Sequence, residues 1–297
     1  MKILMSVPNI SEGRNLEAVE QVAEAVRQTP GVKLIDYSSD ADHNRSVLTY
    51  LGEPEAVLAA SQAMAAKTFE LIDMSRQQGS HPRLGAVDVA PFIPIRNMDT
   101  AEAVEISRQF GRFVGGLGVP VYYYRESATR PDRYDLPDIR KGQYEALPEK
   151  MKDLAKWQPD EGPAVFNAKA GAMATGCRFP LIAFNVNLRT TDVSIAKRIA
   201  EAVRHKNGGY RYVQAMGIDL KEQGMAQVSM NLTNYLQTPL PRVLETVRME
   251  AARHGVMVAG TEIIGTIPLG AVDEIIKHYV QDHDFKLEQI IETALLE

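Results

Sequence analysis

The chain has 297 residues, of which 45% are hydrophobic and 24% are charged, values typical of a soluble globular protein. Its net charge of −5 argues against a nucleic-acid binder that works through bulk charge, and charged side chains interrupt every apolar run before the roughly 18 residues of a membrane span. The opening MKILMSVPNI lacks the pattern of a secretory leader, and the single cysteine, Cys177, cannot form an intramolecular disulfide. These features predict a cytoplasmic protein.

The first hundred residues alternate between strand and helix patterns. The predicted elements are, in order, a strand over 2–8, a helix capped by Asn15, strands over 32–37 and 45–51, a helix from Pro54 through Met74, and a strand over 85–95. A polar loop (SSDADHN) separates the second and third strands. This β-α-β-β-α-β order predicts a ferredoxin-like unit, in which two helices pack on one face of a four-stranded sheet.

A further helix capped by Asp99 and Glu102 and a strand over 119–124 extend this unit. Residues 125–178 are rich in Pro, Gly and charges, and we interpret them as an ordered connector with one short helix near 148–155. A second series then follows: a strand over 180–188, a helix capped by Thr191, strands over 211–218 and 225–232, a helix over 240–254, a strand over 256–267, and helical stretches near 269–279 and 285–295.

The expected fold is therefore α/β (α+β), with two ferredoxin-like subdomains, mixed sheets and helices on the outer faces. We place the subdomains at residues 1–178, which include the connector, and 179–297. A cleft between two such subdomains is a favoured place for a small-molecule site.

Two of the six histidines, His43 and His81, occupy loops next to predicted strands, where functional side chains concentrate. Pro82 restricts His81 to an extended conformation, and Asp88 lies just inside the following strand. A histidine fixed in this way suits proton transfer, but a turn histidine bonded to the backbone fits the pattern equally well. The other four lie in the last turns of helices or in the polar C-terminal segment.

Other catalytic patterns are weaker. The sequence has no HExxH, CxxC or paired histidines at helical spacing, so we predict no metal site. The run GPAVFNAKAGAMATG at 162–176 allows backbone amides to approach a ligand closely, although composition favours a packing loop of small residues. We expect Cys177 to fill a small buried volume rather than to act as a nucleophile.

Several segments together resemble the glutamate formiminotransferase family, also called glutamate formimidoyltransferase. They span nearly the whole chain in family order: VPNISEG at 7–13, LIDMSRQQGSHPRLGAVDVAPFIPIR at 71–96, YEALP at 144–148, DEGPAVFNAKAGAMATG at 160–176, LIAFNVNL at 181–188 and AQVSMNL at 226–232.

The resemblance implies transfer of the formimino group from N-formimino-L-glutamate to N5 of tetrahydrofolate, giving 5-formiminotetrahydrofolate and L-glutamate in histidine degradation. It also implies a substrate tunnel between the subdomains, tetrahydrofolate as co-substrate without a metal, and a homodimer without nucleic-acid or membrane partners. Vertebrate members continue into a cyclodeaminase domain. We expect this chain not to deaminate its product.

By motif, the family's catalytic histidine corresponds to His81. Its folate-binding loop corresponds to Gly162, Pro163, Ala164, Val165, Phe166, Asn167, Ala168, Lys169, Ala170 and Gly171. One departure concerns the second strand, where relatives carry an aspartate two residues after LxD. Here Tyr37 and Ser38 follow Asp36, with Asp40 further along, so no catalytic carboxylate is assigned there.

The implied reaction removes a proton from N5 and returns one to the departing glutamate nitrogen, and a neutral imidazole can do both. Both substrates are anionic, and guanidinium groups bind carboxylates bidentately. Candidate cations beside the matched segments are Arg45, Arg83, Lys169 and Arg178, with Arg83 the strongest; surface ion pairing is the alternative.

Two other functions fit the same sequence. One is formyl transfer between 5-formyltetrahydrofolate and glutamate with the same base. The other is a folate-binding protein without turnover, which the intact HPRLG at 81–85 disfavours.

Overall fold

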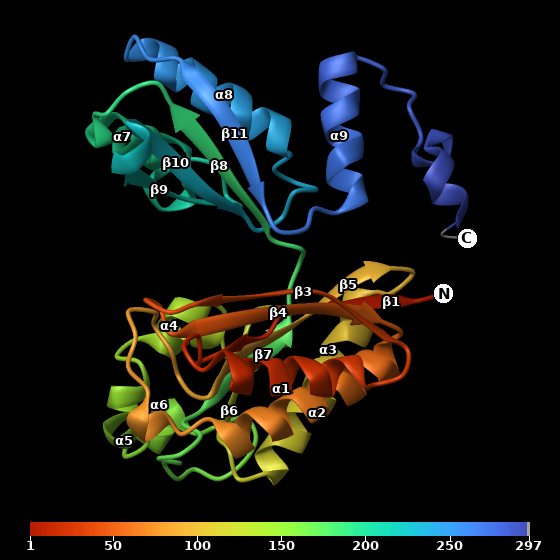
Figure 1. Ribbon diagram of the computed structural model, residues 1–297, viewed down its shortest axis with the longest axis vertical. Coiled ribbons are helices and arrows are strands. Elements are labelled where there is room, and N and C mark those ends of the chain that lie inside the picture. Colours follow the sequence, from red (N-terminus) through yellow and green to blue (C-terminus); the bar gives the residue numbers. More distant parts are fainter. Residues whose placement is uncertain (296–297) are drawn as a thin grey trace. The chain divides into compact units, whose positions relative to one another are not determined.

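The computed structural model describes residues 1–295. The chain divides into two compact units, of which the first is Met1–Arg178 and the second begins at Phe179 (Figure 1). Each unit has its own buried core.

The first unit contains the predicted ferredoxin-like arrangement. Four of its strands pair antiparallel in the order β3-β4-β1-β5. They are β1 (Ile3–Ser6), β3 (Val32–Asp40), β4 (Arg45–Gly52) and β5 (Val87–Arg96). The short β2 (Asn9–Ile10) continues from β1 and also pairs with β4 and β5. Helices α1 (Leu16–Arg27) and α2 (Pro54–Leu71) supply apolar side chains to the same core, as the predicted topology requires.

Local capping chemistry sets several helix boundaries. The Asn15 side chain accepts from the Ala18 N–H at 3.1 Å, and Asp99 and Glu102 form a reciprocal capping box at the start of α3 (Thr100–Gly116). Both caps were predicted. The expected extension of α2 to Met74 was wrong, because Ile72 adopts an extended conformation and Asp73 caps a separate 3₁₀ turn at Met74–Arg76.

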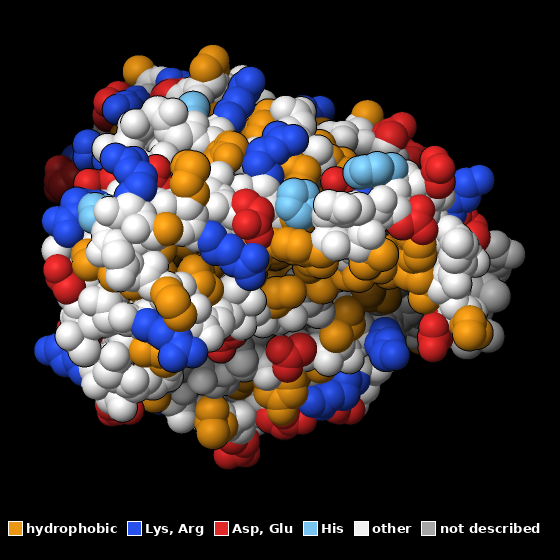
Figure 2. All heavy atoms as spheres, turned by 90° about the horizontal axis from the view of Figure 1, so that it is seen from above, with side chains coloured by type: hydrophobic (Ala, Val, Ile, Leu, Met, Phe, Trp, Pro, Cys, Tyr) orange, Lys and Arg blue, Asp and Glu red, His pale blue; other side chains and the backbone are white. Residues whose placement is uncertain are grey.

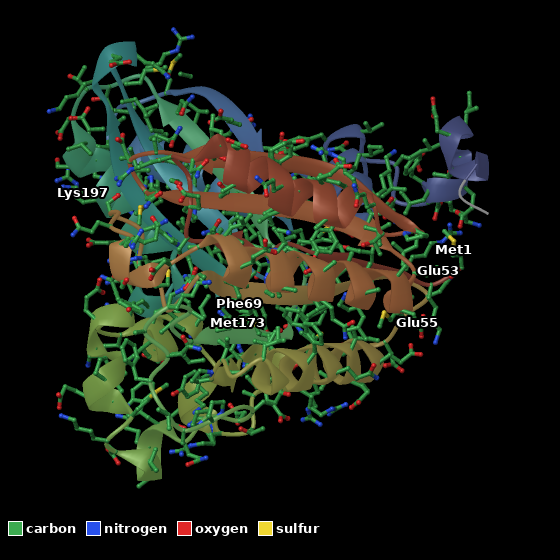
Figure 3. All side chains as sticks on the ribbon, turned by 60° about the horizontal axis from the view of Figure 1, so that its bottom comes forward. Met1, Glu53, Glu55, Phe69, Met173 and Lys197 are labelled. Atoms are coloured by element: carbon green, nitrogen blue, oxygen red, sulfur yellow. The ribbon has the colours of Figure 1, made fainter. Side chains whose placement is uncertain are left out.

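A strand that the sequence did not indicate lies inside the first sheet. Strand β7 (Met173–Cys177) is fully buried and pairs parallel with both β5 and β6 (Val121–Tyr123). Its residues lie in and beside the run that we interpreted as a small-residue loop. Met173 belongs to the main core against which Phe69 of α2 packs (Figure 3). Small side chains suit this position, because a Cβ at Gly176 would collide with the Tyr124 carbonyl.

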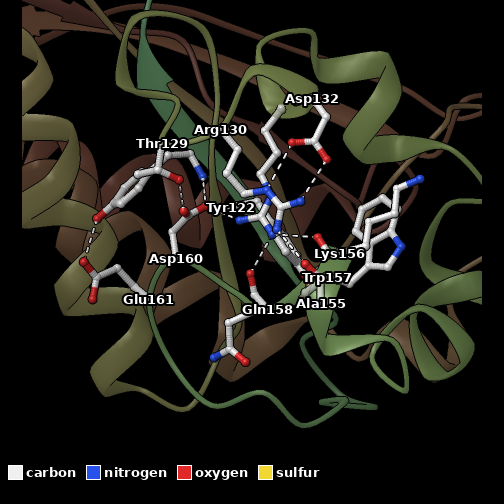
Figure 4. Close-up of polar contacts among 12 residues, drawn as sticks. Tyr122, Thr129, Arg130, Asp132, Ala155, Lys156, Trp157, Gln158, Asp160 and Glu161 are labelled. Atoms are coloured by element: carbon white, nitrogen blue, oxygen red, sulfur yellow. Dashed lines mark hydrogen bonds and ion pairs between the residues drawn. The ribbon is translucent and has the colours of Figure 1, made fainter.

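The connector is ordered, as expected, but consists of several short helices rather than one. Its α-helices are α4 (Leu136–Arg140), α5 (Leu147–Lys150) and α6 (Leu154–Trp157). A buried ion pair holds it in place: Arg133 Nη1 lies 2.8 Å from Asp160 Oδ2, and the guanidinium also donates to the Lys156 and Gln158 carbonyls (Figure 4). Thr129 and the Tyr123 N–H donate to the same carboxylate.

The second unit repeats the β-α-β-β-α-β order. Its four strands form an antiparallel sheet in the order β11-β8-β10-β9. They are β8 (Ile182–Leu188), β9 (Val213–Leu220), β10 (Met225–Leu232) and β11 (Val258–Ile264). Helices α7 (Val193–Val203) and α8 (Leu240–Arg253) pack against it, followed by α9 (Leu269–Val280).

Two expectations in this unit need correction. The cap of α7 is Asp192 rather than Thr191, because the Asp192 carboxylate accepts from the Ser194 N–H at 2.8 Å. The stretch expected to be helical near 285–295 holds only 3₁₀ turns, at Leu287–Gln289 and Ile291–Leu295.

The surface carries both signs of charge. Acidic and basic side chains are interspersed over the face seen in Figure 2 rather than separated by sign. No helix within residues 1–295 is both long enough and apolar enough to cross a membrane.

Candidate active site

His81 lies in the loop between α2 and β5, and 13% of its side chain is exposed. Its Nδ1 is 3.4 Å from Nη1 of Arg45, and its Nε2 is 3.6 Å from Oδ2 of Asp88. A guanidinium only donates, so Nδ1 of the neutral ring accepts and the proton sits on Nε2, facing the carboxylate. Nε2 is buried and has no hydrogen-bond partner among the described residues. Nδ1, by contrast, has only the long contact with Arg45 at 3.4 Å.

Asp88 is held from two sides. Its Oδ1 accepts from the Leu84 N–H at 2.9 Å, which fixes the loop that follows His81. Arg140 of α4 binds both carboxylate oxygens, with Nε at 3.2 Å from Oδ1. The connector therefore supplies the cation that neutralises this buried acid.

Burial of Asp88 favours its protonated form and works to raise its pKa. The Arg140 guanidinium, assisted by the contacts with His81 and the Leu84 N–H, outweighs burial and holds the pKa of Asp88 below its usual range. Asp88 is consequently a carboxylate at neutral pH, and a negative charge faces Nε2 of His81.

Arg83 also lies in this loop, but its guanidinium is already engaged. It donates to the Gln77 carbonyl at 2.9 Å and to Glu145 at 2.8 Å, with Gln143 at 3.4 Å, and 5% of the residue is exposed. We predicted Arg83 as the strongest substrate-binding cation. In this arrangement its terminal nitrogens brace the loop against the connector.

The N-terminal motif VPNISEG frames the same loop. Ser11 Oγ donates to the Gly85 carbonyl at 2.7 Å, and the Ser11 N–H donates to the Ala86 carbonyl. Glu12 accepts from Gln77 at 2.8 Å and from two N–H groups at the start of α1. The motif therefore joins the first helix to the histidine loop.

The turn between β3 and β4 carries a second histidine next to His81. The Nδ1 atom of His43 lies 2.8 Å from Oδ2 of Asp40, and its ring centroid is 6.4 Å from that of His81. Asp40, which the sequence left without a role, thus forms a histidine–carboxylate pair beside the loop.

The Gly162–Gly171 segment is mostly exposed up to Lys169. Val165 is 67% exposed, and the Phe166 ring packs on Tyr144 with centroids 5.4 Å apart. The Asn167 side chain fixes the turn by donating to the Gly118 carbonyl and accepting from the Ala170 N–H. The segment therefore presents apolar side chains at the surface, on a backbone that the hydrogen bonds of Asn167 hold in place.

This segment and the histidine loop are physically joined. Gly171 forms a β-bridge with Gly85, and the Ala172 N–H donates to the Leu84 carbonyl at 3.1 Å. Tyr144 contacts both segments: its N–H donates to the Arg83 carbonyl and its hydroxyl to the Ala168 carbonyl at 2.6 Å.

The remaining candidate cations differ in position. Arg45 lies at His81, and its Nε is buried without a partner among residues 1–295. The Lys169 ammonium instead donates to the Glu70 carbonyl near the end of α2, and Arg178 follows β7, its N–H bonded to the Phe92 carbonyl. Arg140 and Gln77 were missed, because nothing local in their sequence marks a partner dozens of residues away.

Cys177 is buried, and burial raises the pKa of its thiol to about 12, which fits the expected packing role. The described residues hold no cluster of three His, Cys, Asp or Glu side chains able to bind a metal ion.

A partly buried histidine beside an ionised carboxylate is a candidate general base, because the carboxylate can orient the ring and stabilise its protonated form. Two family models match the chain: the formiminotransferase domain, N-terminal subdomain, over residues 3–178, and the formiminotransferase domain over residues 183–295. The chain belongs to the formiminotransferase family, and is thus a transferase.

Curated relatives agree with this assignment. The chain is 44% identical over 297 residues to glutamate formimidoyltransferase of Streptococcus pyogenes serotype M1, covering 99% of each. It is also 44% identical to glutamate formimidoyltransferase of Thermoplasma acidophilum, covering 99% of this chain and 98% of that protein. Formimidoyltransferase-cyclodeaminase of Mus musculus is 43% identical over 91% of this chain, which matches 51% of that longer protein.

Proposed function

We propose that this protein transfers the formimino group from N-formimino-L-glutamate to N5 of tetrahydrofolate, with His81 as the general base. The observation that carries the proposal is the full-length similarity to two glutamate formimidoyltransferases. The proposal extends to a role in histidine degradation, in the cytoplasm and as a homodimer. Sedimentation of the purified protein tests the dimer.

The contacts of His81 support its role. The ionised Asp88 lies 3.6 Å from Nε2, which favours the tautomer with its proton on Nε2 and its lone pair on Nδ1. Nδ1 then takes the N5 proton as N5 attacks the amidine carbon, and the imidazolium formed is stabilised by the adjacent carboxylate. The reaction needs no covalent bond to the protein, because holding both substrates together supplies proximity.

Arg45 is the cation best suited to a substrate carboxylate. Its Nη1 contacts Nδ1 of His81 only at 3.4 Å, so this hydrogen bond is weak and a substrate oxygen can replace it at small cost. Burial lowers the pKa of Arg45, assisted by the nearby Arg140 charge, and a bound carboxylate would offset this unfavourable environment.

We place the folate at the Gly162–Gly171 segment. The exposed Val165 and the Phe166–Tyr144 pair offer an apolar surface of the kind on which a flat pterin packs, and backbone groups are accessible beside it. Because Tyr144 also bonds to the histidine loop, the folate and the base would share one support.

The direct test is steady-state kinetics of the purified protein with two substrate pairs: formiminoglutamate with tetrahydrofolate, and 5-formyltetrahydrofolate with glutamate. We expect a higher kcat/KM for the formimino pair, with product masses confirming the transfer. A higher kcat/KM for formyl transfer would overturn the choice of donor. Folate binding by calorimetry without turnover of either pair would establish a binding protein instead.

A further inference from the structure

The Asp40–His43 pair has the geometry of a working acid/base residue. Both oxygens of Asp40 serve His43: Oδ1 accepts from the backbone N–H and Oδ2 contacts ring Nδ1, each at 2.8 Å. With Nδ1 engaged by the carboxylate, Nε2 is the nitrogen that meets a ligand. The His43 side chain is 49% exposed, so a substrate can reach it.

The position of His43 beside His81 is fixed by the backbone. The Asn44 side chain donates to the Gln78 carbonyl at 3.0 Å, and the Ser80 N–H donates to the Asp42 carbonyl at 3.3 Å. Gly79 packs so closely against the His43 carbonyl that a Cβ there would collide with it. The turn between β3 and β4 and the histidine loop therefore hold the two rings 6.4 Å apart.

The reaction moves two protons at two different nitrogen atoms, whereas one of the two ring nitrogens of His81, Nε2, is buried. Its Nε2 is buried against Asp88, so a single-histidine mechanism requires Nδ1 to serve both the attacking and the departing nitrogen in turn. A second imidazole, whose centroid lies 6.4 Å from that of His81, removes this requirement.

We propose that His43 is the general acid of the reaction: it protonates the departing glutamate nitrogen, while His81 takes the proton of folate N5. This inference rests on the proposed function. It assigns Asp40 as the positioning residue that sets the His43 tautomer.

The N5 lone pair forms the new C–N bond, the C=N π electrons move to the imino nitrogen, and the N5 proton passes to His81 Nδ1. The imino nitrogen then re-forms the double bond, and the C–N bond to glutamate breaks with its electron pair on the departing nitrogen. That nitrogen takes a proton from His43 Nε2. A proton then passes from His81 to His43 through solvent, which resets the site.

Charged groups of both signs surround His43, and the adjacent Asp40 carboxylate is the one that favours an imidazolium. Asp40 and Asp42 lie on its own turn, Arg45 and His81 lie toward the histidine loop, and Arg14 donates to the Ala41 carbonyl from the segment before α1. Hydrogen bonds from the His43 backbone and ring lower the pKa of Asp40, which keeps its negative charge beside the ring.

The test compares His43→Gln and His43→Ala with a control, His254→Gln, whose histidine is exposed at the end of α8 in the other unit. We expect the His43 variants to lower kcat by roughly 10- to 100-fold, at the low end for a general acid because solvent reaches the site. The alkaline limb of the pH profile of kcat should disappear, and added imidazole should restore part of the His43→Ala rate. Asp40→Asn should lower kcat less. The control should match the wild type.

If the His43→Gln variant has the kcat of the wild type and keeps both limbs of the pH profile, the assignment of His43 is overturned while the proposed function still stands. A change in KM alone, without imidazole rescue, would also overturn it. Absence of transfer by the wild-type protein would instead overturn the proposed function, and this inference with it.

Discussion

Nε2 of His81 lies 3.6 Å from Oδ2 of Asp88, a carboxylate whose side chain is 1% exposed and whose two oxygens are both bound by Arg140. The proposed base is thus oriented by an acid that depends on a cation from a separate segment of the chain.

Replacing His81 by alanine should lower kcat by roughly 10²- to 10⁴-fold, the usual contribution of a general acid/base residue. The fold should persist, because His81 lies in a loop and its contacts are long. Steady-state kinetics and circular dichroism of the same preparation check both statements. Near-wild-type turnover would remove His81 from the mechanism.

For the wild type, turnover should also fall at acid pH, because an imidazolium cannot accept the N5 proton.

Asp88→Asn should destabilise the first unit at neutral pH by about 3 kcal/mol, because it leaves Arg140 without a charged partner. Urea unfolding followed by fluorescence of Trp157, the single tryptophan, measures this change. Adding Arg140→Met to the variant should recover part of the loss. Equal stability of Asp88→Asn and the wild type at pH 7 would contradict the importance of the pair.

The same pair predicts a pH dependence. The pKa of Asp88 in the folded state lies below its unfolded value, so its ionised form stabilises the fold above the unfolded pKa, and the contribution is lost as pH falls through the folded pKa. The difference in unfolding free energy between the wild type and Asp88→Asn should therefore shrink below about pH 4. A difference that is constant from pH 7 to pH 3 would show that charge is not its source.

Gly171→Ala should weaken folate binding strongly. Gly171 has φ +72°, and a Cβ there would lie well inside contact distance of the Leu84 carbonyl oxygen. Gly208→Ala is the matched control, because Gly208 has φ +92° but open space around it, so only the left-handed backbone cost of about 1–2 kcal/mol applies. Because Leu84 belongs to the histidine loop, Gly171→Ala should also lower kcat, and the larger Gly171→Val should do so more. Calorimetric titration with a folate analogue ranks these variants.

Lys169→Ala should cost at most about 1 kcal/mol of folate binding, because its ammonium donates to the Glu70 carbonyl at the surface. The same titration measures it. Complete loss of binding in Lys169→Ala together with a silent Gly171→Ala would mean that the segment works by charge rather than through its backbone.

Arg133→Met should destabilise the connector by about 3 kcal/mol, because it leaves the buried Asp160 carboxylate without its cation (Figure 4). Trp157 reports the change directly, since Arg133 binds the carbonyl of the preceding residue, Lys156. Arg112→Ala, which breaks an exposed pair with Glu105, should cost less than about 1 kcal/mol and serves as the control. Similar losses in both variants would contradict the distinction between buried and exposed pairs.

The part of the fold that was predicted correctly rests on local signals. Apolar periodicity and the caps at Asn15 and Asp99 place the helices, and the β-α-β-β-α-β order then gives the order of four antiparallel strands in each unit. Strand β7 was not found, because its small residues carry no strand signal until β5 and β6 lie on either side of it.

The candidate site, too, could be predicted only where its signals are local in the sequence. His81 stands out because Pro82 and the surrounding motif are contiguous. Its contacts with Arg45 and with the Asp88–Arg140 pair join separate segments, and no spacing rule connects residues 52 positions apart. The partners of Arg83 and Lys169, Glu145 and the Glu70 carbonyl, likewise become visible only in three dimensions, and the roles of both cations in substrate binding stay predictions.

The connector of short helices contributes Arg140, Gln143 and Tyr144 to the histidine loop and, through Tyr144, touches the glycine-rich segment. A sub-global opening of this connector would dismantle the base and the predicted folate surface together while the antiparallel sheet stays intact. Catalytic competence would then be governed by the opening free energy of the connector rather than by global stability. Native-state hydrogen exchange should find the amides of Tyr144 and Ala172 opening together, and mild denaturant should abolish turnover before the sheet unfolds.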